Sequence, residues 1–265
     1  QRKIFNFRKN ILKMISFNIL SKLLIFPLYY TFHCNIFFGW IHKKYLKSFK
    51  YKNLIFDLKD FEIPLSNHSS FIFNTYELND RIILERNLSK KHKCIIIGGG
   101  IGFVPSIVNT VTKNKVMIFE INEKIIKNLK LNLSFNNIRF KVFNYNLLLN
   151  NKDKKNYYYS SENFLATSMY RKTKRRVKLK NLNYKKVPSI NKFNTLIIDG
   201  EGIEKHYIEN ISVLKNIKHI FFEFHNDIFS DKEKFQIFKK LNNKGFYLKD
   251  SFINSYYFAK STSLK

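Results

Sequence analysis

The sequence predicts an α/β fold: a Rossmann-like, seven-stranded, mostly parallel sheet with helices on both faces, preceded by an N-terminal helical extension. Three observations lead to this prediction. Short apolar runs alternate with amphipathic segments, one run ends in a cluster of glycines, and acidic residues follow later runs. Repeated strand–helix units give parallel sheets, because each crossover returns the chain to the same edge. We place the extension at residues 1–50 and the α/β domain at residues 51–265.

Composition limits the class of protein. A chain of 265 residues, 45% of them apolar, can bury one sizeable core. Its two cysteines, Cys34 and Cys94, are far apart and in no metal-ligand spacing, so we expect a reducing, cytoplasmic location without disulfides. The net charge of +29 would suit nucleic acid, but the basic residues are spread along the chain and accompany abundant Asn, Ile, Phe and Tyr, as in A/T-rich genomes. We therefore do not expect a nucleic-acid partner.

The extension is basic and apolar. Four apolar residues recur on one helical face: Ile11, Ile15, Ile19 and Leu23. Residues 23–41 carry no formal charge and are long enough to span a bilayer, but Pro27 and several polar residues interrupt the run. We expect helices packed on the α/β domain. The alternative is a peripheral membrane contact through residues 11–45.

The α/β domain is expected to alternate strands with helices. Apolar runs of four to six residues predict strands at residues 53–58, 94–97, 115–119, 138–143, 195–198 and 219–224, with shorter ones at 246–248 and 256–259. Apolar residues three or four apart predict helices at residues 75–88, 104–111, 122–134, 203–214 and 232–241. Residues 150–190 are polar and basic, and we expect them to form an irregular insertion.

The strand at residues 94–97 runs into four glycines within five positions: Gly98, Gly99, Gly100 and Gly102. Glycine tolerates the sharp turn from strand to helix and lets a ligand lie against backbone N–H groups. Glu120 ends the next strand, eighteen residues after Gly102, where a carboxylate can accept both hydroxyls of a ribose. This pattern favours an adenosine-containing cofactor over an ordinary tight turn.

Further polar side chains follow later strands, where parallel sheets bind their ligands. Asp199 and Glu201 come directly after the strand at 195–198 and are candidate catalytic acids, although Asp199 could instead cap a helix. His225 ends another strand and is either a general base or a polar residue without a catalytic role. Asn144 and Asn146 either meet an adenine edge or simply form a turn.

At these residues the sequence resembles the FkbM-type family of class I S-adenosylmethionine-dependent methyltransferases. The resemblance covers residues 71–257 and rests on four motifs in the same order, at residues 96–102, 119–121, 197–204 and 223–225. The sequence departs from the family pattern at Ile96, where the family has an acid, at Gly100, where it has an asparagine, and at Ile197, where it has a lysine. The departure at Ile96 is expected to weaken cofactor affinity, and the departure at Ile197 removes a catalytic or substrate-binding candidate.

The resemblance implies methyl transfer from S-adenosylmethionine to a hydroxyl of a small molecule or glycan, such as a sugar or a secondary metabolite. Asp199, Glu201 or His225 would take the hydroxyl proton, and a Mg²⁺ ion bridging Asp199 and Glu201 is left open. The insertion at 150–190 would border the acceptor. The residues implied for cofactor binding are Gly98, Gly99, Gly100, Gly102, Glu120, Asn144 and Asn146.

Three rival interpretations remain. A flavin- or nicotinamide-dependent oxidoreductase would need a third spaced glycine, where this chain has Phe103. A nucleic-acid methyltransferase is suggested by charge alone, without a strand end suited to a flipped base. A degenerate, non-catalytic binding module associated with membranes is favoured by Ile96, Ile197 and the apolar extension.

Overall fold

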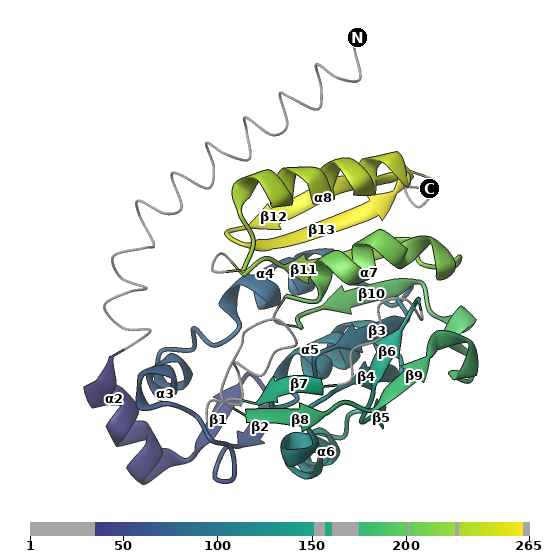
Figure 1. The fold of residues 1–265 in the computed structure, drawn as a ribbon. Helices are drawn as coiled ribbons and strands as arrows, with labels where there is room; N and C mark the ends of the chain where they lie inside the picture. Colours follow the sequence, from purple (N-terminus) through teal and green to yellow (C-terminus); the bar gives the residue numbers. More distant parts are fainter. Residues whose placement is uncertain (1–34, 151–156, 161–174, 201, 226–227, 262–265) are drawn as a thin grey trace.

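A computed structural model describes residues 35–150, 157–160, 175–200, 202–225 and 228–261. A seven-stranded sheet of order β12-β13-β11-β10-β3-β4-β5 lies at its centre (Figure 1). The strands of this sheet are β3 (Cys94–Ile97), β4 (Val116–Phe119), β5 (Phe140–Phe143), β10 (Thr195–Ile198), β11 (His219–Glu223), β12 (Phe246–Phe252) and β13 (Ser255–Lys260).

Five of these strands are parallel, in the order β5, β4, β3, β10 and β11, whereas β13 runs antiparallel to both β11 and β12. The predicted fold class, a seven-stranded and mostly parallel sheet, is confirmed. In register, Ile97 lies opposite Phe119 on one side and Ile198 on the other. The chain therefore leaves β3, β4 and β10 at the same edge of the sheet.

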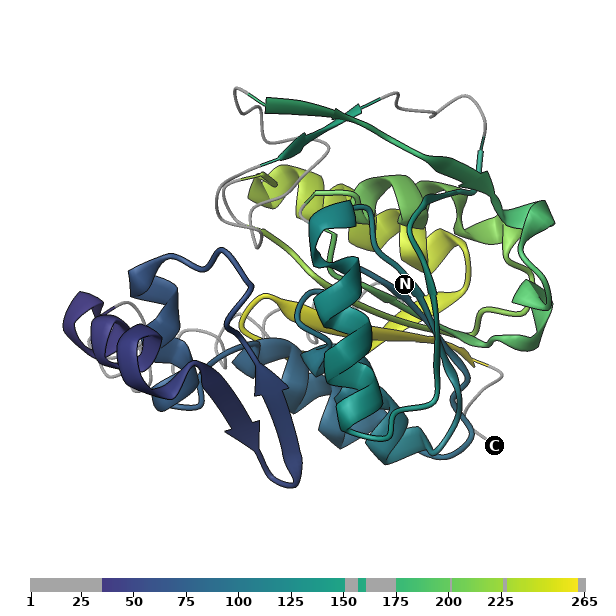
Figure 2. The ribbon, with the colours of Figure 1, turned by 90° about the horizontal axis from the view of Figure 1, so that it is seen from below.

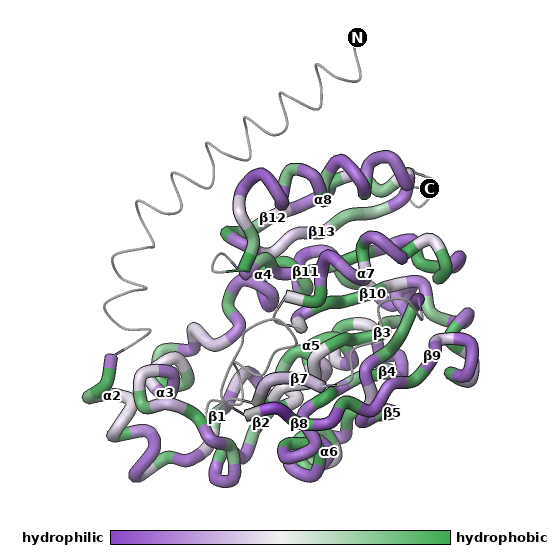
Figure 3. Tube along the Cα trace, viewed as in Figure 1, coloured by the Kyte–Doolittle hydropathy of each residue, from purple (hydrophilic) through white to green (hydrophobic). Residues whose placement is uncertain are grey.

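The core lies on both faces of the sheet. Every residue of β3, β4 and β10 is buried, as expected for parallel strands covered by helices on both sides. Alternate side chains serve opposite faces: Ile96 packs with α4, α5 and α6, whereas Ile95 and Ile97 pack with α7 and α8. Along α8, hydrophilic and hydrophobic residues alternate, because one side faces this core (Figure 3). The helices are α4 (Leu78–Asn87), α5 (Phe103–Thr112), α6 (Ile126–Phe135), α7 (Glu204–Asn210) and α8 (Asp231–Asn243).

Each strand and helix expected between residues 53 and 259 has a counterpart. Two of the expected helices are shorter, because part of each is a 3-10 turn. A turn capped by Asn122 precedes α6, and another turn follows α7. The described 3-10 turns are η2 (Glu123–Ile125), η5 (Tyr184–Lys186), η6 (Ile190–Lys192) and η7 (Ile211–Val213).

The described part of the N-terminal region lies beside the sheet (Figures 1 and 2). Its elements are α2 (Ile36–Ile41), the π-helical turn η1 (His42–Leu46), β1 (Ser48–Tyr51), β2 (Leu54–Asp57) and α3 (Leu65–Ile72). β1 and β2 pair as an antiparallel hairpin, so the boundary expected between residues 50 and 51 falls inside β1. Among the described residues, no helix is long and apolar enough to cross a membrane.

The hairpin is attached to the α/β domain by packing and by two asparagine amides. Asn136, which follows α6, accepts from Ile55 N (2.8 Å) and donates to Ile55 O (2.7 Å). Phe49 and Phe56 both pack against Phe103 at the start of α5. The side chain of Asn132 in α6 accepts from Asp57 N (2.9 Å) and donates to Asp57 O (3.1 Å) and to Ile101 O (3.0 Å). Because Ile101 lies in the glycine turn, the same amide connects hairpin, helix and turn.

Residues 150–190 are not wholly irregular. In the described part, β7 (Tyr157–Ser160) pairs antiparallel with β8 (Arg175–Lys178), and β9 (Asn181–Asn183) pairs in parallel with β6 (Asn146–Leu148). Tyr158 is buried and lies opposite Val177, which gives the basic hairpin one apolar face. This alternation is too short to stand out among the surrounding lysines and asparagines.

Two buried histidines connect η1 to α3. His42 Nε2 donates to Ser48 O (2.9 Å), so its neutral Nδ1 accepts from His68 Nδ1, also at 2.9 Å. Burial lowers the pKa of both, to about 4 for His68, where the nearby His42 and Lys43 lower the pKa further. A proton added to His42 would turn its Nδ1 into a second donor and break the pair.

We predict that His68 contributes a loss in the free energy of unfolding as pH drops from about 6.5, the usual histidine pKa, toward 4, and that this contribution appears as the difference between the wild-type chain and His68→Asn. The unfolded chain takes up the proton on His68 first, because the folded pKa is the lower one. Urea unfolding at a series of pH values would measure this loss. The variant His68→Asn keeps a donor for His42 without titrating, so its unfolding free energy should depend less on pH. An identical pH dependence in both proteins would contradict the assignment.

Candidate functional site

The glycine turn follows β3 in a conformation that other residues rarely adopt. Gly98, Gly100 and Gly102 have positive φ angles of 92°, 51° and 93°. A Cβ atom on Gly98 would also overlap the carbonyl oxygen of Asp199, at the end of the neighbouring strand β10. The glycine turn and the Asp199 segment are thus in direct contact.

Glu120 fixes this turn. Its buried carboxylate accepts from Gly99 N (2.8 Å) and Gly100 N (3.3 Å) through Oε2, and from Asn122 N (2.7 Å) through Oε1. Burial raises the pKa of Glu120, and these three N–H groups oppose that rise. Gly98 N donates to Phe119 O, and Gly102 N to Gly99 O. The expectation that these glycines offer bare N–H groups to a ligand is wrong, because all four donate within the protein.

The two asparagines have structural partners. Asn144 Nδ2 donates to Glu120 O (2.9 Å) and Ile121 O (3.3 Å), and so holds the loop that follows β4. Asn146 is buried, and its Nδ2 donates to Asn181 Oδ1 at 3.0 Å, between β6 and β9. Asn146 also borders the cleft described next, whereas Asn144 does not.

A cleft of about 320 Å³ lies at the carboxyl ends of the parallel strands. It brings together six of the residues that the sequence indicated: Gly98, Gly100, Glu120, Asn146, Asp199 and His225. Gly99 and Gly102 instead lie against side chains of α6. Glu201 lies outside the residues that the structure describes.

The cleft contains three acids that were not proposed as site residues. Glu77 and Asp80 come from the start of α4, and Glu223 is the last residue of β11. Burial raises the pKa of all three, to about 7 for Asp80, and Asp199 raises it further. Glu77 also has a left-handed backbone with φ 49°, which is uncommon outside glycine. For Glu77 and Asp80 the only sequence signal was their place at the start of a helix, where acids usually serve the helix dipole. Glu223 belongs to the motif at residues 223–225, but it was not named as a site residue.

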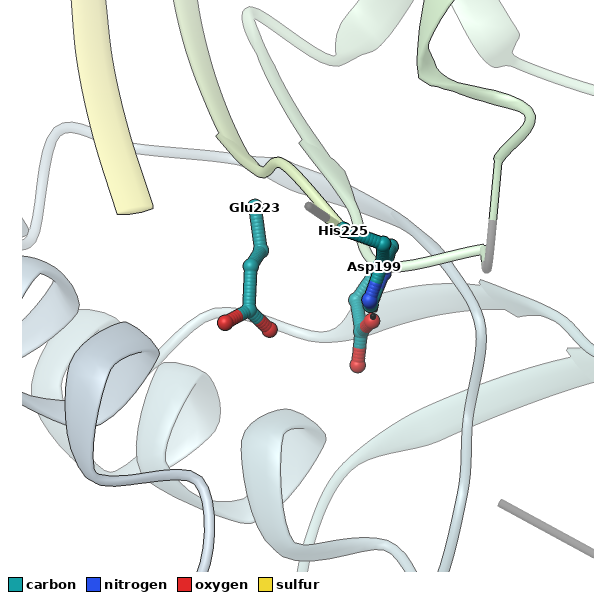
Figure 4. A group of neighbouring side chains, drawn as sticks. All are labelled: Asp199, Glu223 and His225. Atoms are coloured by element: carbon teal, nitrogen blue, oxygen red, sulfur yellow. Dashed lines mark ion pairs between the residues drawn. The ribbon is translucent and has the colours of Figure 1, made fainter. Parts of the chain in front are cut away.

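His225 lies among carboxylates. Its Nε2 is 3.6 Å from Asp199 Oδ1 and 3.8 Å from Glu204 Oε1. Figure 4 shows His225 beside Asp199, with Glu223 across from them. Glu204 is completely buried, and its Oε1 accepts from Gly200 N at 3.2 Å. Burial raises the pKa of Glu204 to about 7, against the opposing effect of His225. The Glu204 carboxyl can therefore exchange a proton near neutral pH.

The same side chains have the composition of a cation site. One ligand atom each from Asp199, Glu223 and His225 lie within 4.8 Å of one another, and Glu77, Asp80 and Glu223 form a second such group. The mixed set suits a transition metal, and the carboxylate set suits Mg²⁺ or Ca²⁺. No lysine or arginine of the described residues forms an ion pair with these four acids. The negative charge of the cleft is therefore balanced within the described protein only by His225, when it is protonated.

Comparison with protein-family models found no match, and neither did comparison with curated proteins. Solved structures with a similar chain path include precorrin-6y C5,15-methyltransferase from Geobacter metallireducens, at 12% identity, a TM-score of 0.43, and coverage of 71% of this chain and 88% of that chain. A methyltransferase from Pyrococcus furiosus is 13% identical, with a TM-score of 0.44 and coverage of 85% of this chain and 95% of that chain. A SAM-dependent methyltransferase from Aquifex aeolicus is 11% identical, with a TM-score of 0.41 and coverage of 69% of this chain and 89% of that chain. At this level of similarity these structures assign no function to the chain.

The contact between Gly98 and Asp199 predicts a position-specific cost. Gly98→Ala should destabilise the protein by about 1–2 kcal/mol for its backbone conformation and by a further ~1–3 kcal/mol for the overlap with Asp199. Gly245→Ala is the matched control, because its φ is 81° but no atom lies within 4 Å of the added Cβ. Urea unfolding of both variants measures the difference, and equal losses would show that the contact has no effect.

Proposed function

We propose that the protein is an S-adenosylmethionine-dependent methyltransferase that methylates a hydroxyl of a small molecule or glycan. The observation that carries this proposal is the acidic cleft, in which the carboxylate of Glu120 holds the glycine turn and Asp199 and His225 lie across from it. A cofactor with a positively charged sulfur suits such a cleft.

Two features fit this cofactor. A Cβ on Gly100 would meet only the hydroxyl of Tyr76, at 3.7 Å, so the turn is open toward the cleft at this point. An ionised carboxylate can accept about four hydrogen bonds, and Glu120 uses three for backbone N–H groups. Glu120 therefore retains capacity for a ribose hydroxyl, which supports the assignment made from the resemblance.

The same features disfavour a dinucleotide cofactor. In flavin- and nicotinamide-binding proteins the pyrophosphate lies on N–H groups of the glycine turn. Here the carboxylate of Glu120 occupies the N–H groups of Gly99 and Gly100, and further acids line the cleft. A pyrophosphate would meet like charge instead of free donors, so the oxidoreductase interpretation is the weaker one.

When bound, the cofactor supplies a methyl group made electrophilic by its sulfur. The chain has to orient the acceptor hydroxyl and remove its proton. In this proposal His225 takes the proton at Nε2, and Asp199, 3.6 Å away, stabilises the resulting imidazolium. Tyr76 is buried over the turn and limits access of water. Glu201 remains a candidate from the sequence, and the insertion at residues 150–190 is proposed to border the acceptor.

The cofactor assignment predicts selective binding. Isothermal titration calorimetry with S-adenosylmethionine, NADH and FAD in parallel should detect only the first. Glu120→Gln should weaken that binding about tenfold or more, the scale of a lost charge-assisted hydrogen bond. Glu123→Gln is the control, since Glu123 is exposed and pairs with Lys180 on the surface. Equal affinity of both variants would remove Glu120 from the ribose site, and binding of NADH or FAD alone would overturn the function.

The catalytic assignment predicts a rate effect without a binding effect. His225→Ala should lower methyl transfer by ~10²–10⁴-fold while the affinity for the cofactor persists. The assay would follow release of demethylated cofactor across a panel of sugars and other hydroxyl compounds. Activity should survive EDTA. If activity instead requires Mg²⁺ or Mn²⁺, then Asp199, Glu223 and His225 are metal ligands and His225 is not the base.

A further inference from the structure

One surface of the N-terminal region is both apolar and basic. We call it the basic aromatic patch, and it consists of exposed side chains of α2, η1 and β1. Its apolar members are Ile36, Phe37, Trp40, Tyr45 and Leu46, and its basic members are Lys43, Lys44, Lys47 and Lys50. The apolar members are between 45% and 65% exposed.

This concentration of apolar side chains is unusual for a surface. Twelve large hydrophobic residues are exposed in the described part of the chain, and five of them fall within the eleven residues 36–46. The others are scattered, as isolated exposed apolar residues normally are. A contiguous apolar surface bordered by charge marks an interaction site.

The patch is held in place from behind. Gly39 is buried because α2 packs on α3, where a Cβ would overlap the carbonyl oxygen of Leu65. His42 is buried against His68 of α3. Since Gly39 and His42 fix the inner side of this segment, Phe37 and Trp40 remain on the outer side at 64% and 45% exposure.

The charged residues that precede Asp57 are all basic. The first 56 residues contain eleven lysines and arginines and no aspartate or glutamate, and the first acid is Asp57. Within the patch, Lys44 Nζ lies 4.8 Å from the centre of the Trp40 ring and 5.1 Å from that of Tyr45. Cation and rings thus lie at the same level, as they do at a membrane interface.

We propose that the basic aromatic patch binds an anionic lipid surface. Phe37, Trp40 and Tyr45 enter the interfacial layer, and the lysines contact acidic headgroups. Amphipathic elements with aromatic and aliphatic residues beside lysines bind membranes in this way, and each lysine near the surface contributes roughly fivefold to partitioning. A nucleic acid would use the lysines but leave the aliphatic Ile36 and Leu46 in water. An anionic lipid surface binds both the apolar and the basic side chains of the patch.

The chain has an internal reporter for this contact, because Trp40 is its only tryptophan. The full chain would be mixed with vesicles of phosphatidylcholine, or of phosphatidylcholine and phosphatidylglycerol. With the anionic vesicles only, Trp40 emission should shift to shorter wavelength and be quenched by lipids brominated in their acyl chains. Added salt should weaken the binding, because the lysine contribution is screened.

Variants locate the contact. Phe37→Ser combined with Tyr45→Ser should lower partitioning at least tenfold in vesicle flotation, and Lys43→Glu combined with Lys44→Glu should abolish it. Phe235→Ser on α8 removes an aromatic side chain of 52% exposure and should change nothing. Lys232→Glu combined with Lys239→Glu, also on α8, is the matched charge control.

Three outcomes would overturn the proposal. The first is unchanged Trp40 emission with anionic vesicles. The second is equal loss of binding in the patch variants and the α8 controls. The third is binding to DNA, or self-association in sedimentation velocity, that depends on the patch while vesicle binding does not. Because none of these readouts involves methyl transfer, they test the patch independently of the cleft.

Discussion

The candidate site depends on one buried carboxylate. Glu120 receives three backbone N–H groups, two from the glycine turn and one from the loop after its own strand. Without it, those donors would be left unpaired in a buried environment, at roughly 1–3 kcal/mol each. The turn can therefore hold its positive φ angles only where β4 delivers this side chain beside β3. In this protein the carboxylate of Glu120 therefore shapes the glycine turn through its own hydrogen bonds.

Much of the fold and part of the site could be predicted, because they follow from local patterns. Four-residue apolar runs such as 94–97 and 195–198 fix buried parallel strands, and the acids or glycines after them necessarily meet at one edge. β1 was not predicted because its alternation of Ser48 and Lys50 with two inward aromatic residues covers only four residues, too few to stand out. Glu77 and Asp80 escaped because their role depends on where α4 begins in space, and no short-range pattern encodes that position.

Two positions at which the sequence departs from the pattern it resembles are neighbours in the sheet. Ile96 and Ile197 lie opposite each other in the pairing of β3 with β10, and both are buried in the same core. Two apolar side chains in register pack there without the desolvation cost that buried charges would carry. Asp80, one of the acids of the cleft, lies near Ile197, and no lysine or arginine of the described residues forms an ion pair with it.

The amide of Asn132 has a consequence for how the chain can be divided. It bonds both backbone groups of Asp57, in the hairpin, and the carbonyl of Ile101, in the glycine turn. Hairpin and turn therefore share one anchoring point on α6, and a displacement of either must be accommodated by the other. The N-terminal hairpin therefore helps to hold the glycine turn, which borders the cleft. A shortened chain that begins at β2 would lose the strand that pairs with β2 and holds Asp57 in place beside Asn132.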